Sequence, residues 1–193
     1  MIRWAVFVSG SGTNLQSLLD LEAQNSWKHQ SIVAVHADRK CLALERAQKA
    51  SKSCFLYSKN EIDYDLKLLD FLKSQNVNAI FLLGYMRVLS SDFLRKWKYP
   101  LINLHPSLLP AHKGKDSIQR AYQANDEVIG VSLHEVSEEV DSGKILRQIS
   151  FPRLPEETLE ALETRVHAFE RKIIRDYCFD LEIEEERRVA LDS

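Results

Sequence analysis

The stretch WAVFVSGSGTNLQSLLDLE, residues 4–22, contains the pattern that decides the fold. Trp4–Val8 is a short apolar run typical of a buried strand, and a loop of serines and glycines follows it directly. From Asn14 to Glu22 the apolar residues recur at the spacing of one helix face. A buried strand that turns through glycines into an amphipathic helix is how the repeating unit of an α/β domain begins.

Short apolar runs and longer amphipathic segments keep alternating along the chain. The short runs predict strands at 32–36, 54–57, 79–83, 101–104, 130–136 and 144–151. The amphipathic segments predict helices at 42–50, 62–74, 116–124 with an Asp116–Ser117 cap, and 156–177 with a capping signal at Pro155–Glu156. We therefore expect one α/β domain whose mostly parallel sheet is flanked by helices, with an antiparallel strand pair near the C-terminal end.

The composition indicates a globular protein that binds neither nucleic acid nor membranes. Of the 193 residues 45% are hydrophobic, and 26 Lys and Arg against 28 Asp and Glu give a net charge of −2. That balance lacks the basic surface of a nucleic-acid binder, and no apolar stretch approaches the roughly 20 residues that span a bilayer. The N-terminus has no signal-peptide cleavage site, and three scattered cysteines without a CxxC motif are typical of a reducing compartment. We expect a cytoplasmic protein.

Neither the histidines nor the acidic residues near the C-terminus show a metal-ligand pattern. No pair of histidines has a spacing such as HExxH, so no metal is expected. The run Glu182–Glu186, followed by Arg187 and Arg188, is interpreted as a solvated helix end.

The loop after the first strand is a candidate phosphate site. Ligands of open α/β sheets bind at the carboxyl ends of the strands, where Ser9–Asn14 lies. Glycines let the backbone approach a ligand, and the amides at a helix N-terminus attract anions. A dinucleotide fingerprint would place a glycine where Leu15 stands, although Asp38 could imitate its acidic ribose ligand, so a compact phosphate fits better. The alternative is a plain turn capped by Thr13 or Asn14.

The second candidate is the block NLHPSLLP, residues 103–110, at the end of a strand. Asn103 and His105 point to the same side of an extended strand, and Asp141 lies in the loop between the last two strands. An amide and an imidazolium can stabilise an oxyanion, and a carboxylate can keep the imidazole protonated and collect a proton from an attacking amine. This trio needs no serine or cysteine nucleophile and indicates direct acyl transfer. Taken singly, His105 could instead be a core histidine and Asp141 a turn residue.

The block 103–110 with Asp141 resembles the folate-dependent formyltransferases, and the glycine loop is similar to that of the members that formylate glycinamide ribonucleotide. Residues 84–89 and 130–134 match as well, so the resemblance runs from about Ile2 to Glu170. It implies a single-domain, Rossmann-like formyltransferase fold with a seven-stranded sheet. It also implies 10-formyltetrahydrofolate as cosubstrate, no metal, and an acceptor from purine biosynthesis. Residues 1–100 are then expected to bind the acceptor phosphate, and 101–180 to carry catalysis and folate binding.

The resemblance also assigns roles to individual residues. The catalytic residues would be Asn103, His105 and Asp141. The acceptor phosphate would bind Ser11, Gly12, Thr13 and Asn14, and its ribose Glu170. The folate would bind Tyr85, Met86, Arg87, Val88, Leu89, Val136 and Val140. A cis peptide bond is expected at Leu109–Pro110, whereas residues 111–114 depart from the family pattern and leave the shape of that loop open.

Several alternatives remain at this stage. A formyltetrahydrofolate hydrolase would lack the glycine loop, and we expect 193 residues to leave no room for its regulatory domain. The same argument applies to the RNA-binding domain of a formyltransferase that acts on initiator methionyl-tRNA. A formyltransferase for another amine and a non-catalytic nucleotide-binding module are further possibilities. A monomer and a homodimer are equally compatible with the sequence.

Overall fold

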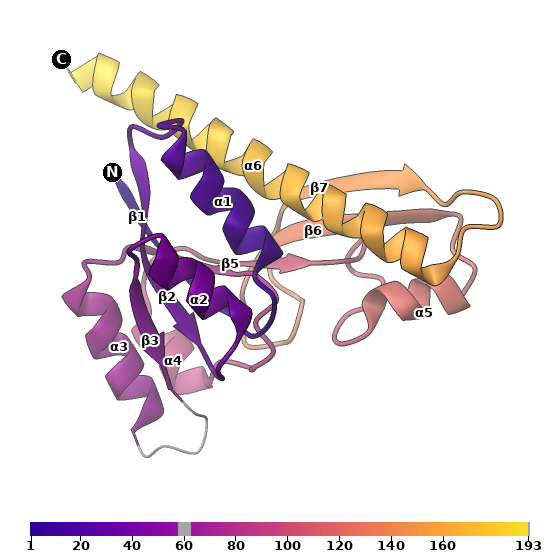
Figure 1. Ribbon diagram of the computed structural model, residues 1–193, viewed down its shortest axis with the longest axis horizontal. Helices are drawn as coiled ribbons and strands as arrows, with labels where there is room; N and C mark the ends of the chain where they lie inside the picture. The colour runs from indigo at the N-terminus through magenta and orange to yellow at the C-terminus, as the bar shows by residue number, and fades with distance from the viewer. Residues whose placement is uncertain (58–62, 193) are drawn as a thin grey trace. The chain divides into compact units, whose positions relative to one another are not determined.

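The computed structural model describes residues 1–57 and 63–192 and shows strands and helices in alternation (Figure 1). The strands are β1 (Ile2–Val8), β2 (Gln30–Ala37), β3 (Ser53–Leu56), β4 (Ala79–Leu82), β5 (Leu101–His105), β6 (Val128–Glu135) and β7 (Ile145–Pro152). The helices are α1 (Thr13–Ala23), α2 (Leu42–Lys49), α3 (Tyr64–Ser74), α4 (Ser91–Lys96), α5 (Ser117–Gln123) and α6 (Leu159–Asp192).

The seven strands form one sheet in the order β3-β2-β1-β4-β5-β6-β7. Strand β1 pairs with β2 and β4 in parallel, and β2 pairs with β3 in parallel. The pairs β5–β6 and β6–β7 are antiparallel. The predicted α/β fold, with a mostly parallel sheet and an antiparallel pair near the C-terminal end, is confirmed.

The backbone divides into two compact units, 1–101 with 178–193 and 102–177. In the first unit β1 is buried from Trp4 to Val8, because a parallel strand inside a sheet is covered on both faces. Trp4 stacks on Phe81 of β4 with ring centroids 4.1 Å apart. Helix α1 packs beside α2, and α3 beside α4 (Figure 1).

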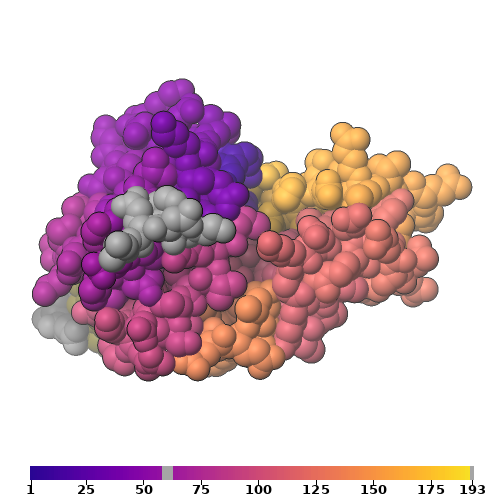
Figure 2. All heavy atoms as spheres, turned by 90° about the horizontal axis from the view of Figure 1, so that it is seen from below, coloured from indigo at the N-terminus to yellow at the C-terminus, as the bar shows by residue number. Residues whose placement is uncertain are grey.

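The second unit contains most of β5, strands β6 and β7, helix α5 and the first part of α6. Its core includes Val131 and Leu133 of β6 and, on α6, Leu162 and Val166 at helical spacing. Helix α5 shows its outer face to solvent in the view from below (Figure 2). No helix among the described residues is long and apolar enough to cross a membrane.

Several predicted boundaries were wrong for identifiable reasons. The long helix begins at Leu159, where Thr158 Oγ1 accepts a hydrogen bond from the Ala161 amide, and not at Glu156. It also continues to Asp192, because neither glycine nor proline follows Tyr177 to end it. The Asp116 cap is absent: its φ of 56° is left-handed, and its side chain makes no cap hydrogen bond.

Two further helices differ from the predictions. Helix α4 was not predicted, although Ser90 caps it by accepting a hydrogen bond from the Phe93 amide at 3.0 Å. The helix predicted at 62–74 starts at Tyr64 in the described residues, and the expected first residue, Ile62, lies outside them.

His36 of β2 is a fully buried histidine of the first unit. Its Nδ1 donates to the Phe55 carbonyl at 2.9 Å, which leaves Nε2 to accept from the Tyr64 hydroxyl at 2.6 Å. Burial lowers the pKa of His36 to about 4, although the Phe55 carbonyl opposes the shift. The folded chain therefore holds His36 neutral.

The neutral His36 predicts a pH-dependent stability. Above pH 6.5 the contribution of neutral His36 to the free energy of unfolding is complete. It is lost as the pH falls toward 4, since His36 then binds a proton in the unfolded chain but not in the folded one. The expected loss is about 3 kcal/mol from this group. Urea unfolding at several pH values measures it, and His36→Gln should flatten the slope over this range. Equal slopes in both proteins would contradict the assignment.

Candidate functional site

Two of the predicted loops lie side by side in the first unit. The strand order β3-β2-β1-β4 changes direction at β1, and ligands of such sheets bind where the order reverses. The glycine loop leaves β1 at this point, and residues 84–89 leave β4. The Ser9 hydroxyl accepts a hydrogen bond from the Met86 amide at 2.8 Å and so connects the two loops.

The glycine loop has a backbone conformation that favours glycine. Gly12 has φ +71°, and a Cβ there would lie 2.5 Å from the Cβ of Ala43. Gly12 is also the N-cap of α1, so the alternative that Thr13 or Asn14 is the cap is wrong. Ser11 and Thr13 are exposed beside these helix amides. The N-cap glycine has no side chain to bond the first amides of α1, which are the kind of main-chain donors that bind anions.

The segment predicted to bind folate combines exposed apolar side chains with a buried anchor. Met86 and Val88 are 55% and 69% exposed, whereas Leu89 is buried. The Tyr85 hydroxyl lies 2.6 Å from that of Tyr64 and 3.2 Å from His36 Nε2. The segment is therefore held by its tyrosine and Leu89, while Met86 and Val88 face solvent.

Two charged residues in this region have structural partners. The Arg87 guanidinium lies 3.5 Å from the centre of the Tyr64 ring, which is a cation–π contact. Asp38 pairs with Arg39 at 2.7 Å and accepts from Ser9. Although burial acts in the opposite direction, these contacts lower the pKa of Asp38. Asp38, which the sequence offered as a possible ribose ligand, thus already has Arg39 and Ser9 as partners.

The predicted trio converges in the second unit. Antiparallel pairing of β5 with β6 sets Asn103 opposite His134 and His105 opposite Ser132. Asn103 Nδ2 donates to Asp141 Oδ1 at 3.2 Å, and His105 Nδ1 lies 3.3 Å from Asp141 Oδ2. The side chains of His105 and Asp141 are 6% and 8% exposed. An amide, an imidazole and a carboxylate therefore meet in one largely dry cluster.

His134 joins the trio as a fourth polar group. Its Nε2 lies 3.1 Å from Asn103 Nδ2 and 3.4 Å from Asp141 Oδ1, and its side chain is buried. These contacts are with two of the three predicted catalytic residues. The sequence did not predict these contacts, because they follow from the position of His134 opposite Asn103, which is known only once the strand pairing is known.

The charges of the cluster depend on burial and on hydrogen bonds. Burial acts to raise the pKa of Asp141, but hydrogen bonds from His134 and the Gly114 amide lower it to about 2. Burial lowers the pKa of His105 despite the His112 carbonyl and the Asp141 carboxylate, which favour the charged ring. That Asp141 keeps His105 protonated stays a prediction: burial opposes the charged ring, whereas acceptors 3.0 Å and 3.3 Å from its two nitrogens favour it.

Residues 107–114 hold the cluster from one side. The Gly114 amide donates to Asp141 Oδ2 at 2.7 Å, and His105 Nε2 donates to the His112 carbonyl at 3.0 Å. The predicted cis bond at Leu109–Pro110 is present. Both oxygens of Asp141 and both nitrogens of His105 thus have protein neighbours before any substrate binds.

The remaining predicted residues of this unit occupy mixed environments. Glu170 on α6 is buried, and its Oε2 accepts from His167 Nδ1 at 2.8 Å. That hydrogen bond raises the pKa of His167. Val136 is half-buried and begins the loop that carries Asp141, and Val140, directly before Asp141, is 48% exposed. Val140 thus resembles Met86 and Val88 in presenting an apolar side chain to solvent.

Comparison with known proteins decides what this arrangement belongs to. Residues 2–177 match the formyl transferase family. The chain belongs to the formyl transferase family.

Individual formyl transferases agree with this assignment. Phosphoribosylglycinamide formyltransferase of Haemophilus influenzae is 34% identical over 177 residues, covering 90% of this chain and 84% of that protein. The crystal structure of phosphoribosylglycinamide formyltransferase from Bacillus halodurans superimposes with a TM-score of 0.88 at 29% identity, covering 93% and 94% of the two chains. The trifunctional purine biosynthetic protein adenosine-3 of Drosophila melanogaster is 37% identical over 174 residues. The chain covers 13% of that longer protein, and 87% of this chain is matched.

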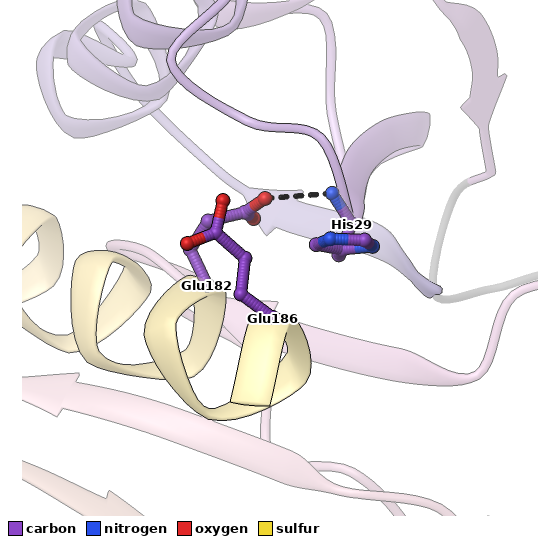
Figure 3. Close-up of side chains that lie close together, drawn as sticks. All are labelled: His29, Glu182 and Glu186. Atoms are coloured by element: carbon purple, nitrogen blue, oxygen red, sulfur yellow. Dashed lines mark hydrogen bonds between the residues drawn. The ribbon is translucent and has the colours of Figure 1, made fainter. Parts of the chain in front are cut away.

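The formyl transferase match ends at residue 177, and the rest of α6 belongs to the first unit. There Glu182 is buried, and its carboxylate accepts from the His29 amide at 2.8 Å (Figure 3). The same oxygen accepts from the Lys28 amide at 2.6 Å. Its second oxygen accepts from the Gln30 side chain at 3.0 Å. The interpretation of Glu182–Glu186 as a solvated helix end is therefore wrong for Glu182, which binds α6 to the start of β2.

The same region brings His29, Glu182 and Glu186 together, with one ligand atom of each within 4.8 Å of the others (Figure 3). The two carboxylates have other partners, because Glu182 accepts three N–H groups and Glu186 pairs with Lys28 Nζ at 3.0 Å. The contacts explain how α6 is fastened to the first unit.

Glu182→Gln is expected to lower the free energy of unfolding by about 1–3 kcal/mol, because its amide group would face the Gln30 donor. Burial opposes ionisation, yet the three hydrogen bonds lower the pKa of Glu182. Its contribution is therefore complete above the ordinary carboxyl pKa and is lost as the pH falls through the folded value. Denaturant unfolding at pH 7 measures the change. The exposed neighbour Glu186→Gln is the control and should change stability by less than about 1 kcal/mol; equal effects would contradict the role of Glu182.

Proposed function

We propose that this chain transfers the formyl group of 10-formyltetrahydrofolate to the amine of glycinamide ribonucleotide, a step of de novo purine biosynthesis in the cytoplasm. The observation that carries the proposal is the cluster of Asn103, His105 and Asp141 in a member of the formyl transferase family. Two relatives named phosphoribosylglycinamide formyltransferase, from Haemophilus influenzae and Bacillus subtilis, are 34% and 31% identical to it and support the choice of acceptor.

The reaction starts when the amine of the acceptor attacks the formyl carbon. The carbonyl bond opens to an oxyanion, and an N–H of Asn103 and one of a protonated His105 stabilise that charge in a site with little water. Asn103 Nδ2 now donates to Asp141, so substrate must replace one of the present contacts before the amide can serve the oxyanion.

The ionised Asp141 directs the proton transfer. Its low pKa keeps it a carboxylate at neutral pH, where it accepts a hydrogen bond from the attacking amine. The proton that the amine loses passes to N10 of the folate as the bond between N10 and the formyl carbon breaks. The products are the formylated amine and tetrahydrofolate, so no external reductant, oxidant or metal enters the balance.

The substrates are assigned to the predicted binding residues. The acceptor phosphate binds the amides and hydroxyls of Ser11–Asn14, and its ribose binds Glu170. The folate binds Tyr85–Leu89 together with Val136 and Val140. In this assignment residues 1–100 hold the acceptor phosphate, and 101–180 carry the chemistry and complete the folate site.

An absorbance assay for folate turnover tests the proposal. Tetrahydrofolate should form from 10-formyltetrahydrofolate only when glycinamide ribonucleotide is present. Turnover without any amine would indicate a hydrolase instead. Affinity for a dinucleotide, without affinity for folate, would indicate a nucleotide-binding module.

A further inference from the structure

Arg120 of α5 makes contacts that none of the assigned roles explains. Its side chain reaches back to the segment that precedes the helix. Nη2 donates to the carbonyls of His112 at 2.8 Å and Lys113 at 2.5 Å, and Nε donates to that of Lys115 at 3.1 Å. One planar guanidinium thus holds three main-chain carbonyls within four residues.

The segment that Arg120 holds carries two main-chain groups of the catalytic cluster. The His112 carbonyl accepts from His105 Nε2, and the Gly114 amide donates to Asp141 Oδ2. The same His112 carbonyl therefore receives Arg120 and His105, one on each lone pair. Any shift of this carbonyl turns the imidazole, and any shift of the Gly114 amide moves the carboxylate.

This segment does not hold its shape through regular secondary structure. His112, Gly114 and Asp116 have φ values of 53°, 81° and 56°, so left-handed residues recur at every second position. Such backbones persist only where their surroundings fix them. Arg120 supplies that restraint with a rigid fork, which the flexible ammonium of lysine cannot reproduce.

We propose that Arg120 is a positioning residue for formyl transfer, which holds residues 112–115 so that the His112 carbonyl orients His105 and the Gly114 amide orients Asp141. The inference rests on the proposed function for its kinetic consequence, and its geometry lies entirely within the second unit.

Arg120→Ala tests the proposal by separating kcat from KM. It should lower kcat about 10-fold to 100-fold, while KM for both substrates changes less than about threefold, since the hydrogen bonds of Arg120 found among the described residues go to 112–115. Arg120→Lys keeps the charge but not the planar guanidinium, so it should recover only part of kcat.

Arg153→Ala is the matched control. Arg153 also binds α5, by donating to the Tyr122 carbonyl at 3.0 Å, yet it does not touch residues 112–115 in any contact we find among the described residues. Unchanged kcat in Arg120→Ala, or an equal loss in Arg153→Ala, would overturn the proposal.

An NMR titration of the His105 ring gives a second readout that needs no turnover. Asp141, His134 and Arg120 are the charged or titratable side chains that act on His105, and the positive Arg120 lowers its pKa. Arg120→Ala should therefore raise the pKa of His105 and alter its chemical shifts, whereas Arg153→Ala should leave both unchanged. If wild-type protein fails to transfer formyl groups, the proposed function fails, but this titration still decides the role of Arg120. An unaltered His105 in Arg120→Ala would refute it.

Discussion

Asp141→Asn is expected to lower kcat for formyl transfer at least about a hundredfold, with the fold retained. The asparagine keeps the size of the side chain, and it tolerates the left-handed φ of 51° at this position almost as well as aspartate. It cannot take the proton of the attacking amine, and it replaces the charge that faces His105 Nδ1 at 3.3 Å. The measurement is steady-state kinetics with both substrates, together with circular dichroism to verify folding.

Asp176→Asn serves as the control for this change. Asp176 lies on α6 of the same unit and pairs only with Lys172 in the contacts described, at 2.6 Å on the surface. Its substitution should leave kcat within about twofold, because exposed ion pairs contribute little. A kcat near the wild-type value in Asp141→Asn would remove the carboxylate from the mechanism.

Gly143→Ala is expected to be the most destabilising single change in the loop that carries Asp141. A Cβ at Gly143 would overlap the backbone carbonyl of Glu135, and a backbone atom cannot rotate away as a side chain can. The loop must then shift, which should cost about 2–4 kcal/mol of unfolding free energy and displace the carboxylate two residues before it. Denaturant unfolding measures the stability, and kcat reports the displacement.

Gly10→Ala provides the comparison for stability. Its added Cβ would meet nothing within 4 Å, and Gly10 lacks a positive φ. Its free energy of unfolding should stay within about 1 kcal/mol of the wild-type value. Equal stability of Gly143→Ala and Gly10→Ala would contradict the overlap at Glu135.

Local patterns predicted most of the fold because they reflect burial. The apolar run Trp4–Val8 became the fully covered strand β1, and the leucine spacing after Asn14 became α1. Alternation along a strand also predicted that Asn103 and His105 act on the same side. Their meeting with Asp141 was expected from the loop position and the family resemblance, and the structure brings the three together.

Long-range and main-chain partners account for what the sequence did not predict. Glu182 was expected in solvent, but its partners at Lys28 and His29 stand more than 150 residues earlier. No sequence motif marked Arg120 as a site residue, since it binds main-chain carbonyl groups, which every residue has. The lowered pKa of His105 depends on burial, which a motif does not report.

The most direct measurement follows an isotopically labelled formyl carbon from 10-formyltetrahydrofolate in the presence of glycinamide ribonucleotide. We predict that the label appears on the acceptor amine in an amount equal to the tetrahydrofolate formed, and that His105→Ala abolishes this transfer. Label recovered as free formate, or left entirely on the folate by the wild-type protein, would contradict direct transfer at this cluster.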